Sequence, residues 1–256
     1  MAGLKPVLSF TRCAVIADVH GNRWALQAVL DDISQRGIDV IFNAGDHLFG
    51  PLDPSGTADI LMSLNLPSVA GNQDRELIDD SPASPGSTLE LNRTQLNPGH
   101  RAWLTSLPVK LELPGGILLF HGTPEHDNIY LLETVRQDGS VALASDEEIR
   151  ARLGGVSANV LLCGHTHIPR HVNLGKQLIV NPGSAGLQAY TDDVPVPHVM
   201  ETGSPRARYA ILEQRERGWH AGHVAITYDH EAAARVAEFN GRPDWAWRLR
   251  TGRALN

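Results

Sequence analysis

Side chains that can bind metal ions recur along this sequence, each group following a short apolar stretch and lying near a glycine. They are carboxylate, amide and imidazole groups: Asp18, His20, Asp46, Asn72, His121, His165 and His167. Nitrogen and oxygen ligands without a thiolate suit divalent Mn, Fe, Zn or Ni. A lone Asp-X-His or Gly-Asp pair is common in solvated turns, but two imidazoles separated by one residue after an apolar run rarely serve packing. The series as a whole therefore predicts a metal site.

Short apolar runs predict the strands that must position these groups. Each run ends at one of the ligand groups, and the runs are 12–17, 39–44, 67–70, 117–120 and 159–163. Helical spacing predicts helices between the first three of them, from Ala25 to Ile33 and over 57–64. Strands that alternate with helices favour a parallel sheet. Because the carboxyl ends of parallel strands share one edge, we expect the ligands to converge there.

The rest of the chain predicts a second half that is largely antiparallel. Residues 109–113 and 117–120 predict a hairpin that turns at Gly115-Gly116. Further strands are expected near 177–180, 207–213 and 220–228, and helices over 100–107, 146–153 and 231–240. We expect loops at 81–87, at 123–140 with some helix, and at 191–205, where prolines indicate a surface excursion. No linker divides the chain, so we expect a single domain over residues 1–256.

Composition limits the classes of partner. The chain has 256 residues, 42% hydrophobic and 20% charged, which is typical of a globular protein. Its formal net charge of −7 and the absence of a Lys/Arg-rich run argue against binding of long nucleic acid. A small anionic substrate is compatible with this charge, because a metal site supplies its own positive charge.

Several features bear on location and assembly. Cys13 and Cys163 lie in apolar runs and are expected to be buried, reduced thiols. The apolar run at 7–10 is too short for a secretory signal, and no run reaches ~18 residues, so we expect a cytoplasmic protein without membrane association. Trp245 and Trp247 indicate a packed tail or a subunit contact, which leaves a homo-oligomer open.

The order and spacing of the ligand groups resemble the motif series of the calcineurin-like metallophosphoesterases. The matching segments are Asp18-X-His20, Gly45-Asp46, Gly71-Asn72-X-Asp74, His121-Gly122 and Gly164-His165-Thr166-His167. The resemblance extends from residue 12 to Ser184, and the Asn181-Pro182-Gly183-Ser184 turn is similar to that of the small bacterial phosphodiesterase branch. It implies a four-layer α/β/β/α sandwich of two mixed β-sheets flanked by helices.

The resemblance also implies two divalent transition metal ions, with Mn favoured. Metal one would take Asp18, His20, Asp46 and His167; metal two would take Asp46, Asn72, His121 and His165. Two ions roughly 3.5–4 Å apart clamp the attacking and leaving oxygens of an in-line displacement, and a water between them becomes a hydroxide nucleophile. Two dications, less two carboxylates and the hydroxide, leave roughly one positive unit, which suits a monoanionic diester. We expect Asp46, Asn72 and His165 to act in catalysis.

One position departs from the family pattern. The third motif often reads Gly-Asn-His-Asp/Glu, where the His is thought to protonate the leaving group, and Gln73 occupies that position here. Glutamine donates a hydrogen bond but delivers no proton. Asp74 then loses its usual partner and is expected to cap a turn, and substrates with good leaving groups are favoured. His47 or His126 could substitute, although solvated loop positions are the simpler interpretation.

Substrate contacts are expected from Gln73, Arg75 and Arg170. Each arginine follows a ligand motif, and its planar fork can grip a phosphate oxygen. Surface charge is the simpler interpretation for both arginines.

The favoured function is a phosphodiesterase. The alternatives within the fold are a phosphomonoesterase, a protein phosphatase and a dinucleoside polyphosphate hydrolase. From a different class, a protein-binding scaffold with an impaired metal site is disfavoured because no ligand position is substituted. A metallo-β-lactamase-type site is disfavoured by Pro169, which lies two residues after His167 where that motif has Asp.

Overall fold

The first strand, β1 (Arg12–Ile16), has no exposed side chain from Cys13 to Ile16. In the computed structural model, which describes residues 10–255, its alternate residues enter two different cores. Cys13 and Val15 face the core between two sheets, whereas Ala14 and Ile16 face a core shared with helices. Successive strand residues point to opposite faces, so a strand that is apolar on both faces must be covered on both.

The first sheet has the order β13-β12-β1-β2 and is mixed. β1 pairs parallel with β2 (Ile41–Asn43) and antiparallel with β12 (Ala207–Arg215), which pairs antiparallel with β13 (Gly218–Ile226). The strand predicted over 67–70 is wrong. Only a single bridge joins Ser68 to Asn43, because Gly71 N–H, the next donor on the side that faces β2, donates to the Asp74 carboxylate instead.

The second sheet has the order β3-β4-β7-β9-β8 and is also mixed. Its centre is parallel: β4 (Ile117–Phe120), β7 (Val160–Leu162) and β9 (Gln177–Asn181). Its edges, β3 (Lys110–Leu113) and β8 (Arg170–Leu174), are antiparallel. The expectation of one parallel sheet is therefore wrong in detail, because the parallel strands are divided between two sheets.

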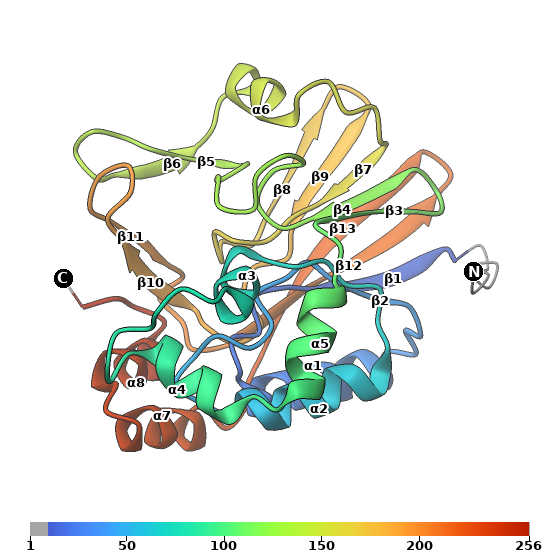
Figure 1. Ribbon diagram of the computed structural model, residues 1–256. Coiled ribbons are helices and arrows are strands. Elements are labelled where there is room, and N and C mark those ends of the chain that lie inside the picture. Colours follow the sequence, from blue (N-terminus) through green and yellow to red (C-terminus); the bar gives the residue numbers. More distant parts are fainter. Residues whose placement is uncertain (1–9, 256) are drawn as a thin grey trace.

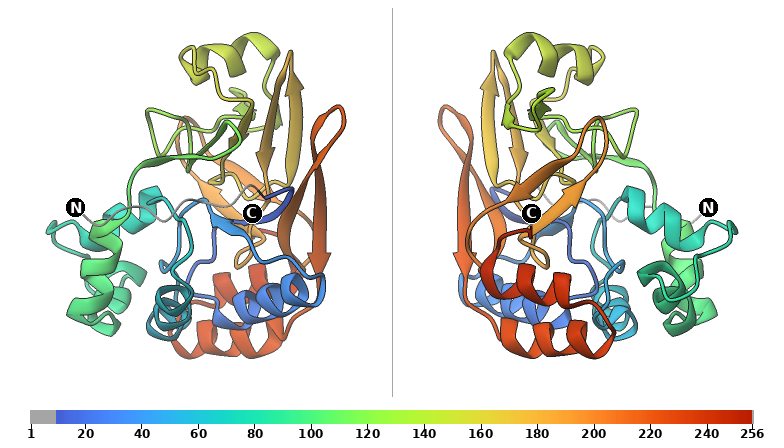
Figure 2. Two further views of the ribbon diagram at one scale, coloured as in Figure 1. Left: turned by 90° about the vertical axis from the view of Figure 1, so that its right-hand side faces the viewer. Right: turned by 90° about the vertical axis from the view of Figure 1, so that its left-hand side faces the viewer.

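Helices complete the sandwich on both outer faces (Figures 1 and 2). The helices that share the core of the first sheet include α1 (Arg23–Gln35), α2 (Pro54–Leu64), α5 (Pro98–Ser106), α7 (His230–Phe239) and α8 (Pro243–Thr251). α6 (Asp146–Leu153) covers the second sheet through Ile149 and Leu153. The predicted four-layer sandwich of two mixed sheets is confirmed.

Three helices were not predicted: α3 (Asn72–Ile78), α4 (Thr88–Gln95) and α8. α3 is only seven residues long and begins at a ligand residue, so it has too few apolar positions to show a helical period. Two predicted loops contain short strands instead. β5 (Glu133–Val135) pairs with β6 (Val141–Leu143), and β10 (Ala189–Asp192) pairs with β11 (His198–Glu201). No residue of 123–140 is helical, so the helix expected there is wrong.

Burial raises the pKa of both thiols, that of Cys13 to about 12, and both cysteines are free and buried as predicted. Among the helices in residues 10–255, none is long and apolar enough to span a bilayer. Residues 1–9, which include most of the N-terminal run considered as a signal, lie outside the described part of the chain.

Candidate metal centre

The ligand side chains come from the carboxyl ends of strands in both sheets. In the first sheet, Asp18 and His20 follow β1, and Asp46 follows β2. In the second sheet, His121 follows β4, whereas His165 and His167 follow β7. Asn72 is the first residue of α3. The centre therefore lies where the edges of two facing sheets meet, rather than along the edge of one.

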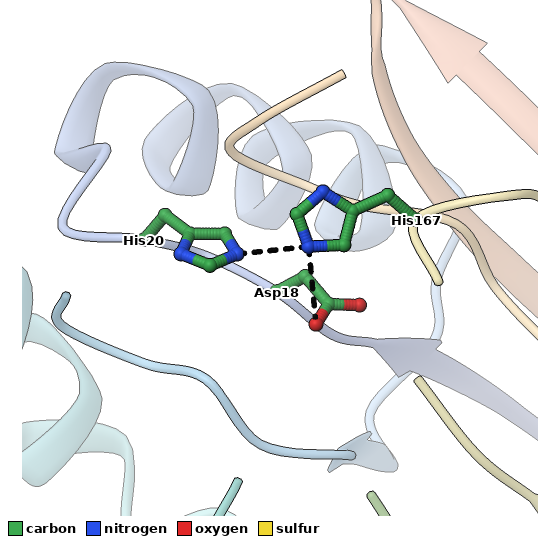
Figure 3. Close-up of side chains that lie close together, drawn as sticks. All are labelled: Asp18, His20 and His167. Carbon is green, nitrogen blue, oxygen red and sulfur yellow. Dashed lines mark hydrogen bonds and ion pairs between the residues drawn. The ribbon is translucent and has the colours of Figure 1, made fainter. Parts of the chain in front are cut away.

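The structure brings these side chains together in two adjacent groups. The first group is Asp18, His20 and His167, and the second is Asp46, His121 and His165. Within each group the potential ligand atoms all lie within 4.8 Å of one another. Figure 3 shows the first group, with both imidazole rings and the carboxylate directed toward one another. The groups coincide with the predicted ligands of metal one and metal two, apart from Asn72 and the sharing of Asp46.

In His20 and His121, a hydrogen bond at Nδ1 leaves Nε2 of the same ring available as a metal ligand. His20 Nδ1 lies 2.9 Å from the carbonyl oxygen of Phe49, and His121 Nδ1 lies 2.7 Å from that of Ala44. A carbonyl only accepts, so each Nδ1 carries a hydrogen and each ring is held in place. His20 Nε2 lies 2.9 Å from His167 Nε2. That contact requires a proton or a cation between the two nitrogens, so the donor set fits a divalent cation.

Burial keeps three imidazoles in the neutral form that binds metal. It lowers the pKa of His20, lowers that of His167 well below its usual value, and together with the charge of His121 lowers that of His165 to about 4. His121 differs: burial lowers its pKa, but the nearby Asp46 carboxylate outweighs burial and raises it to about 10. A proton held on His121 occupies a place that a bound cation would compete for.

Backbone conformation at the ligands is unusual. Asp18, His20, Asp46, His165 and His167 have φ of 55°, 53°, 54°, 72° and 60°, in the left-handed region that non-glycine residues seldom adopt. Each such residue costs about 1–3 kcal/mol and persists only where surrounding contacts enforce it. Backbone strain at five residues of one cluster is typical of a functional site.

Two glycines allow the loops that carry Asp46 and Asn72 to touch. A Cβ on Gly71 would lie 2.1 Å from Asp46 Oδ1 and 2.5 Å from its backbone nitrogen. A Cβ on Gly45 would lie 2.8 Å from both Gly71 N and His121 Nδ1. The glycines beside the motifs are therefore required by close approach and not only by turn geometry.

The Asp74 carboxylate links the loops that carry Asp46 and Asn72 by hydrogen bonds. Its Oδ2 accepts the backbone N–H groups of Asp46 and Gly71, each at 2.9 Å, and lies 2.7 Å from His47 Nδ1. Its Oδ1 accepts the backbone N–H of His47 at 2.9 Å. Asp74 thus does more than cap a turn, because it fixes the backbone that presents Asp46.

Neither histidine considered as a replacement general acid lines the cavity at the metal centre. His47 is completely buried, with its ring 5.2 Å from that of Trp103 at 74°, so the expectation of a solvated loop residue is wrong for it. The hydrogen bond to Asp74 and the contact with the Trp103 ring hold it away from solvent. His126 is exposed, as the simpler interpretation had it.

A cavity of about 690 Å³ opens above the centre. The ligands that line it are His20, Asp46, Asn72, His165 and His167, whereas Asp18 and His121 are buried outside its lining. Gln73 also lines it; its backbone N–H donates to Asp46 Oδ1 at 3.0 Å, and its buried Oε1 has no partner within residues 10–255. The structure therefore places Gln73 where a substrate contact was predicted.

The two arginines predicted to bind substrate lie elsewhere. Arg75 donates to Asp127 at 2.8 and 3.0 Å, Arg170 donates to Glu133 at 2.8 Å, and neither lines the cavity. Arg75 is two residues from Gln73 on α3, so it points to the other side of the helix, and Glu76 lines the cavity instead. Arg242 and Arg248, which sequence reasoning missed, do line the cavity. Their only signal in the sequence was proximity to Trp245.

Comparisons with known proteins identify the family of this chain. A model of the calcineurin-like phosphoesterase superfamily domain matches residues 12–203. An uncharacterized protein of Methanocaldococcus jannaschii is 27% identical, over 91% of this chain and 94% of that protein. A metallophosphoesterase from Sphaerobacter thermophilus has the same fold, with TM-score 0.73 and 23% identity over 94% of this chain and 98% of that one. A hypothetical protein from Pyrococcus horikoshii OT3 gives TM-score 0.72 and 17% identity over 96% and 100%. Because the family model matches most of its length, the chain belongs to the calcineurin-like phosphoesterase superfamily, a family of metal-dependent phosphoester hydrolases.

Proposed function

We propose that this protein is a phosphodiesterase that uses two divalent metal ions to hydrolyse a small phosphate ester. The observation that carries the proposal is the pair of adjacent ligand groups, Asp18/His20/His167 and Asp46/His121/His165, at the base of a cavity. In this proposal Asp46 would bridge the two ions and Asn72 would join the second set, and its Oδ1 lies 3.2 Å from His121 Nε2. Mn is the favoured metal.

When bound, the two cations supply positive charge to the phosphate and activate water as the nucleophile. The protein's own residues do the positioning. Asp46 is held by its backbone N–H bond to Asp74 and by the Gln73 N–H on Oδ1, so its carboxylate has little freedom to turn. Asn72 and His165 line the cavity beside it, where they can hold the phosphate oxygens and the ligand geometry together.

The lining of the cavity favours a diester with a good leaving group. Gln73 can donate its amide N–H to a phosphate or leaving-group oxygen but delivers no proton. His47 is sequestered by Asp74 and does not face the cavity. A monoanionic diester also matches the roughly single positive charge left by two dications, two carboxylates and a hydroxide.

The test compares bis-p-nitrophenyl phosphate with p-nitrophenyl phosphate after metal removal and readdition of Mn. The diester should be cleaved faster, and Asp46→Ala should lose both bound metal and activity. Asp39→Ala, which changes an exposed carboxylate, is the matched control and should retain both. Equal or faster hydrolysis of the monoester would overturn the diesterase assignment but would not contradict the assignment of the metal site.

A further inference from the structure

We propose that Arg242 and Arg248 form a subsite for a second phosphate, so that the substrate is a phosphoester carrying another phosphoryl group on the same molecule. The inference rests on the proposed function, because it places the scissile phosphate at the metal centre. It concerns the wall of the same cavity that is built by the C-terminal helix.

The two arginines lie on the face of α8 that adjoins the metal ligands. Arg242 is the N-cap residue of α8, and Trp245 and Arg248 follow at intervals of three, so all three share one side of the helix. Figure 1 shows α8 beneath β10, and Arg242 contacts Thr88, the first residue of α4. The Trp245 ring lies 6.0 Å from the ring of His20, which connects this wall directly to the first ligand group. All four side chains line one cavity.

Arg248 is a largely covered cation with an unused donor. Its side chain is 12% exposed, and its Nε has no acceptor among residues 10–255. Nη2 donates to Thr191 Oγ1 at 3.2 Å, and the nearest carboxylate, that of Asp244, is 3.6 Å away. A desolvated guanidinium is unfavourable unless its donors are matched, so this group is suited to an anion that enters the cavity.

The carboxylate of Asp244 is already engaged by the other arginine. Arg242 donates to it from Nε at 2.8 Å and from Nη2 at 2.7 Å, while Arg242 Nη1 donates to Thr88 Oγ1. The Asp244 carboxylate is therefore shared by the guanidinium groups of Arg242 and Arg248, which leaves about one positive charge uncompensated at this wall.

The other carboxylates that line the cavity, besides Asp46, are Glu76 and Asp192. Neither forms an ion pair with Arg242 or Arg248. Asp192 accepts instead from the Tyr130 hydroxyl at 3.2 Å and from Val194 N–H at 3.0 Å. Glu76 and Asp192 therefore do not neutralise the positive charge of Arg242 and Arg248 by direct ion pairing.

The shape and chemistry of the cavity select the ligand class. A guanidinium fork binds a phosphate by paired hydrogen bonds. The same cavity is also lined by Phe49, Leu187 and Trp245, which can cover an organic group. A volume of about 690 Å³ accommodates a molecule of nucleotide size. The occupant is therefore an organic molecule with one phosphate at the metal centre and a second on Arg248 and Arg242.

The experiment uses two chromogenic esters that differ by one group: thymidine 5′-(p-nitrophenyl phosphate) and the same ester with a 3′-phosphate. The Mn-loaded wild type should show a higher kcat/KM for the 3′-phosphorylated ester by about 10- to 100-fold, the range of a hydrogen-bonded charge pair. Arg248→Met should abolish this preference through KM, and Arg248→Lys should restore part of it. Arg235→Ala, an exposed arginine on α7 outside the cavity, should keep it.

Equal wild-type rates for the two esters would overturn the subsite, as would an equal loss on both esters in Arg248→Met. Folding of each variant is checked by its melting temperature. Calorimetric titration of Mn-loaded protein with thymidine 3′,5′-bisphosphate and with thymidine 5′-phosphate gives a second readout that needs no turnover. If neither ester is hydrolysed, the proposed function fails, whereas weaker bisphosphate binding in Arg248→Met would still support the subsite and unchanged binding would overturn it.

Discussion

The carboxylate of Asp74 accepts the backbone N–H of Asp46 at 2.9 Å, although the two residues are 28 positions apart in the sequence. The same oxygen accepts Gly71 N–H, so a single buried side chain joins the loops that carry Asp46 and Asn72. The left-handed φ of 54° at Asp46 is stabilised by this bond. Outer contacts of this kind orient metal ligands and commonly affect metal affinity.

Asp74→Asn should weaken Mn binding by about 10- to 100-fold, because an amide offers one acceptor oxygen in place of two and lacks the charge. Calorimetric titration with Mn measures this. Asp80→Asn is the matched control, since the Asp80 side chain is fully exposed and lies 4.0 Å from its ion-pair partner Arg101. An Asp74→Asn protein that binds Mn like the wild type would show that this bond does not position Asp46.

Gly71→Ala should abolish metal binding and lower the melting temperature. Its Cβ would lie 2.1 Å from Asp46 Oδ1, and the contact atoms belong to a loop held by Asp74, so they have little room to move. Gly222→Ala is the control, because a Cβ there meets nothing within 4 Å and its φ is not in the left-handed region. Normal metal content in Gly71→Ala, measured by elemental analysis, would contradict the close-packed loop geometry.

Removal of metal should destabilise the protein. A ligand that binds only the folded state stabilises it by about 2.7 kcal/mol at a concentration of 100 Kd. Chelation should therefore lower the melting temperature, and readdition of Mn should restore it, with about two equivalents bound per chain. The same treatment of Asp46→Ala should leave the melting temperature unchanged. If no transition metal binds under any loading condition, the metal-centre assignment fails.

Gln73→His should make the rate of hydrolysis depend less steeply on the pKa of the leaving group. It introduces a side chain that can donate a proton at a position that lines the cavity, and general acid catalysis contributes about 10²- to 10⁴-fold for poor leaving groups. Rates for a series of aryl and alkyl diesters, plotted against leaving-group pKa, measure the effect. Gln73→Asn, which adds no proton donor of that kind, should keep the steep dependence. An equally steep slope in Gln73→His would indicate that protonation does not limit the reaction.

Much of the candidate site could be predicted locally. The ligand types, their order and their glycine neighbours are properties of short segments, and a strand followed by a sharp turn places each segment's polar group at a sheet edge. Asp18, Asp46 and His165 could therefore be proposed without knowledge of the fold. The close contact of Gly71 with Asp46 explains why glycine accompanies these groups.

Substrate-binding residues could not be predicted in the same way. Arg75 and Arg170 follow ligand motifs, but the turn of α3 and the salt bridge to Glu133 direct them away from the cavity. Arg242 and Arg248 reach it from the C-terminal helix, far from any motif. His47 illustrates the same limit, since only the packing of Asp74 and Trp103 shows that it is buried.

The sequence by itself determined the chemistry of the centre, because ligand identity and the period of apolar residues are encoded within a few neighbouring positions. The tertiary structure alone decided that the ligands come from two facing sheets and that α8 forms one wall of the cavity. Those features depend on strand pairing and helix packing between segments distant in the chain, such as β1 with β12. The free energy of such contacts depends on both segments together, so neither segment alone predicts it.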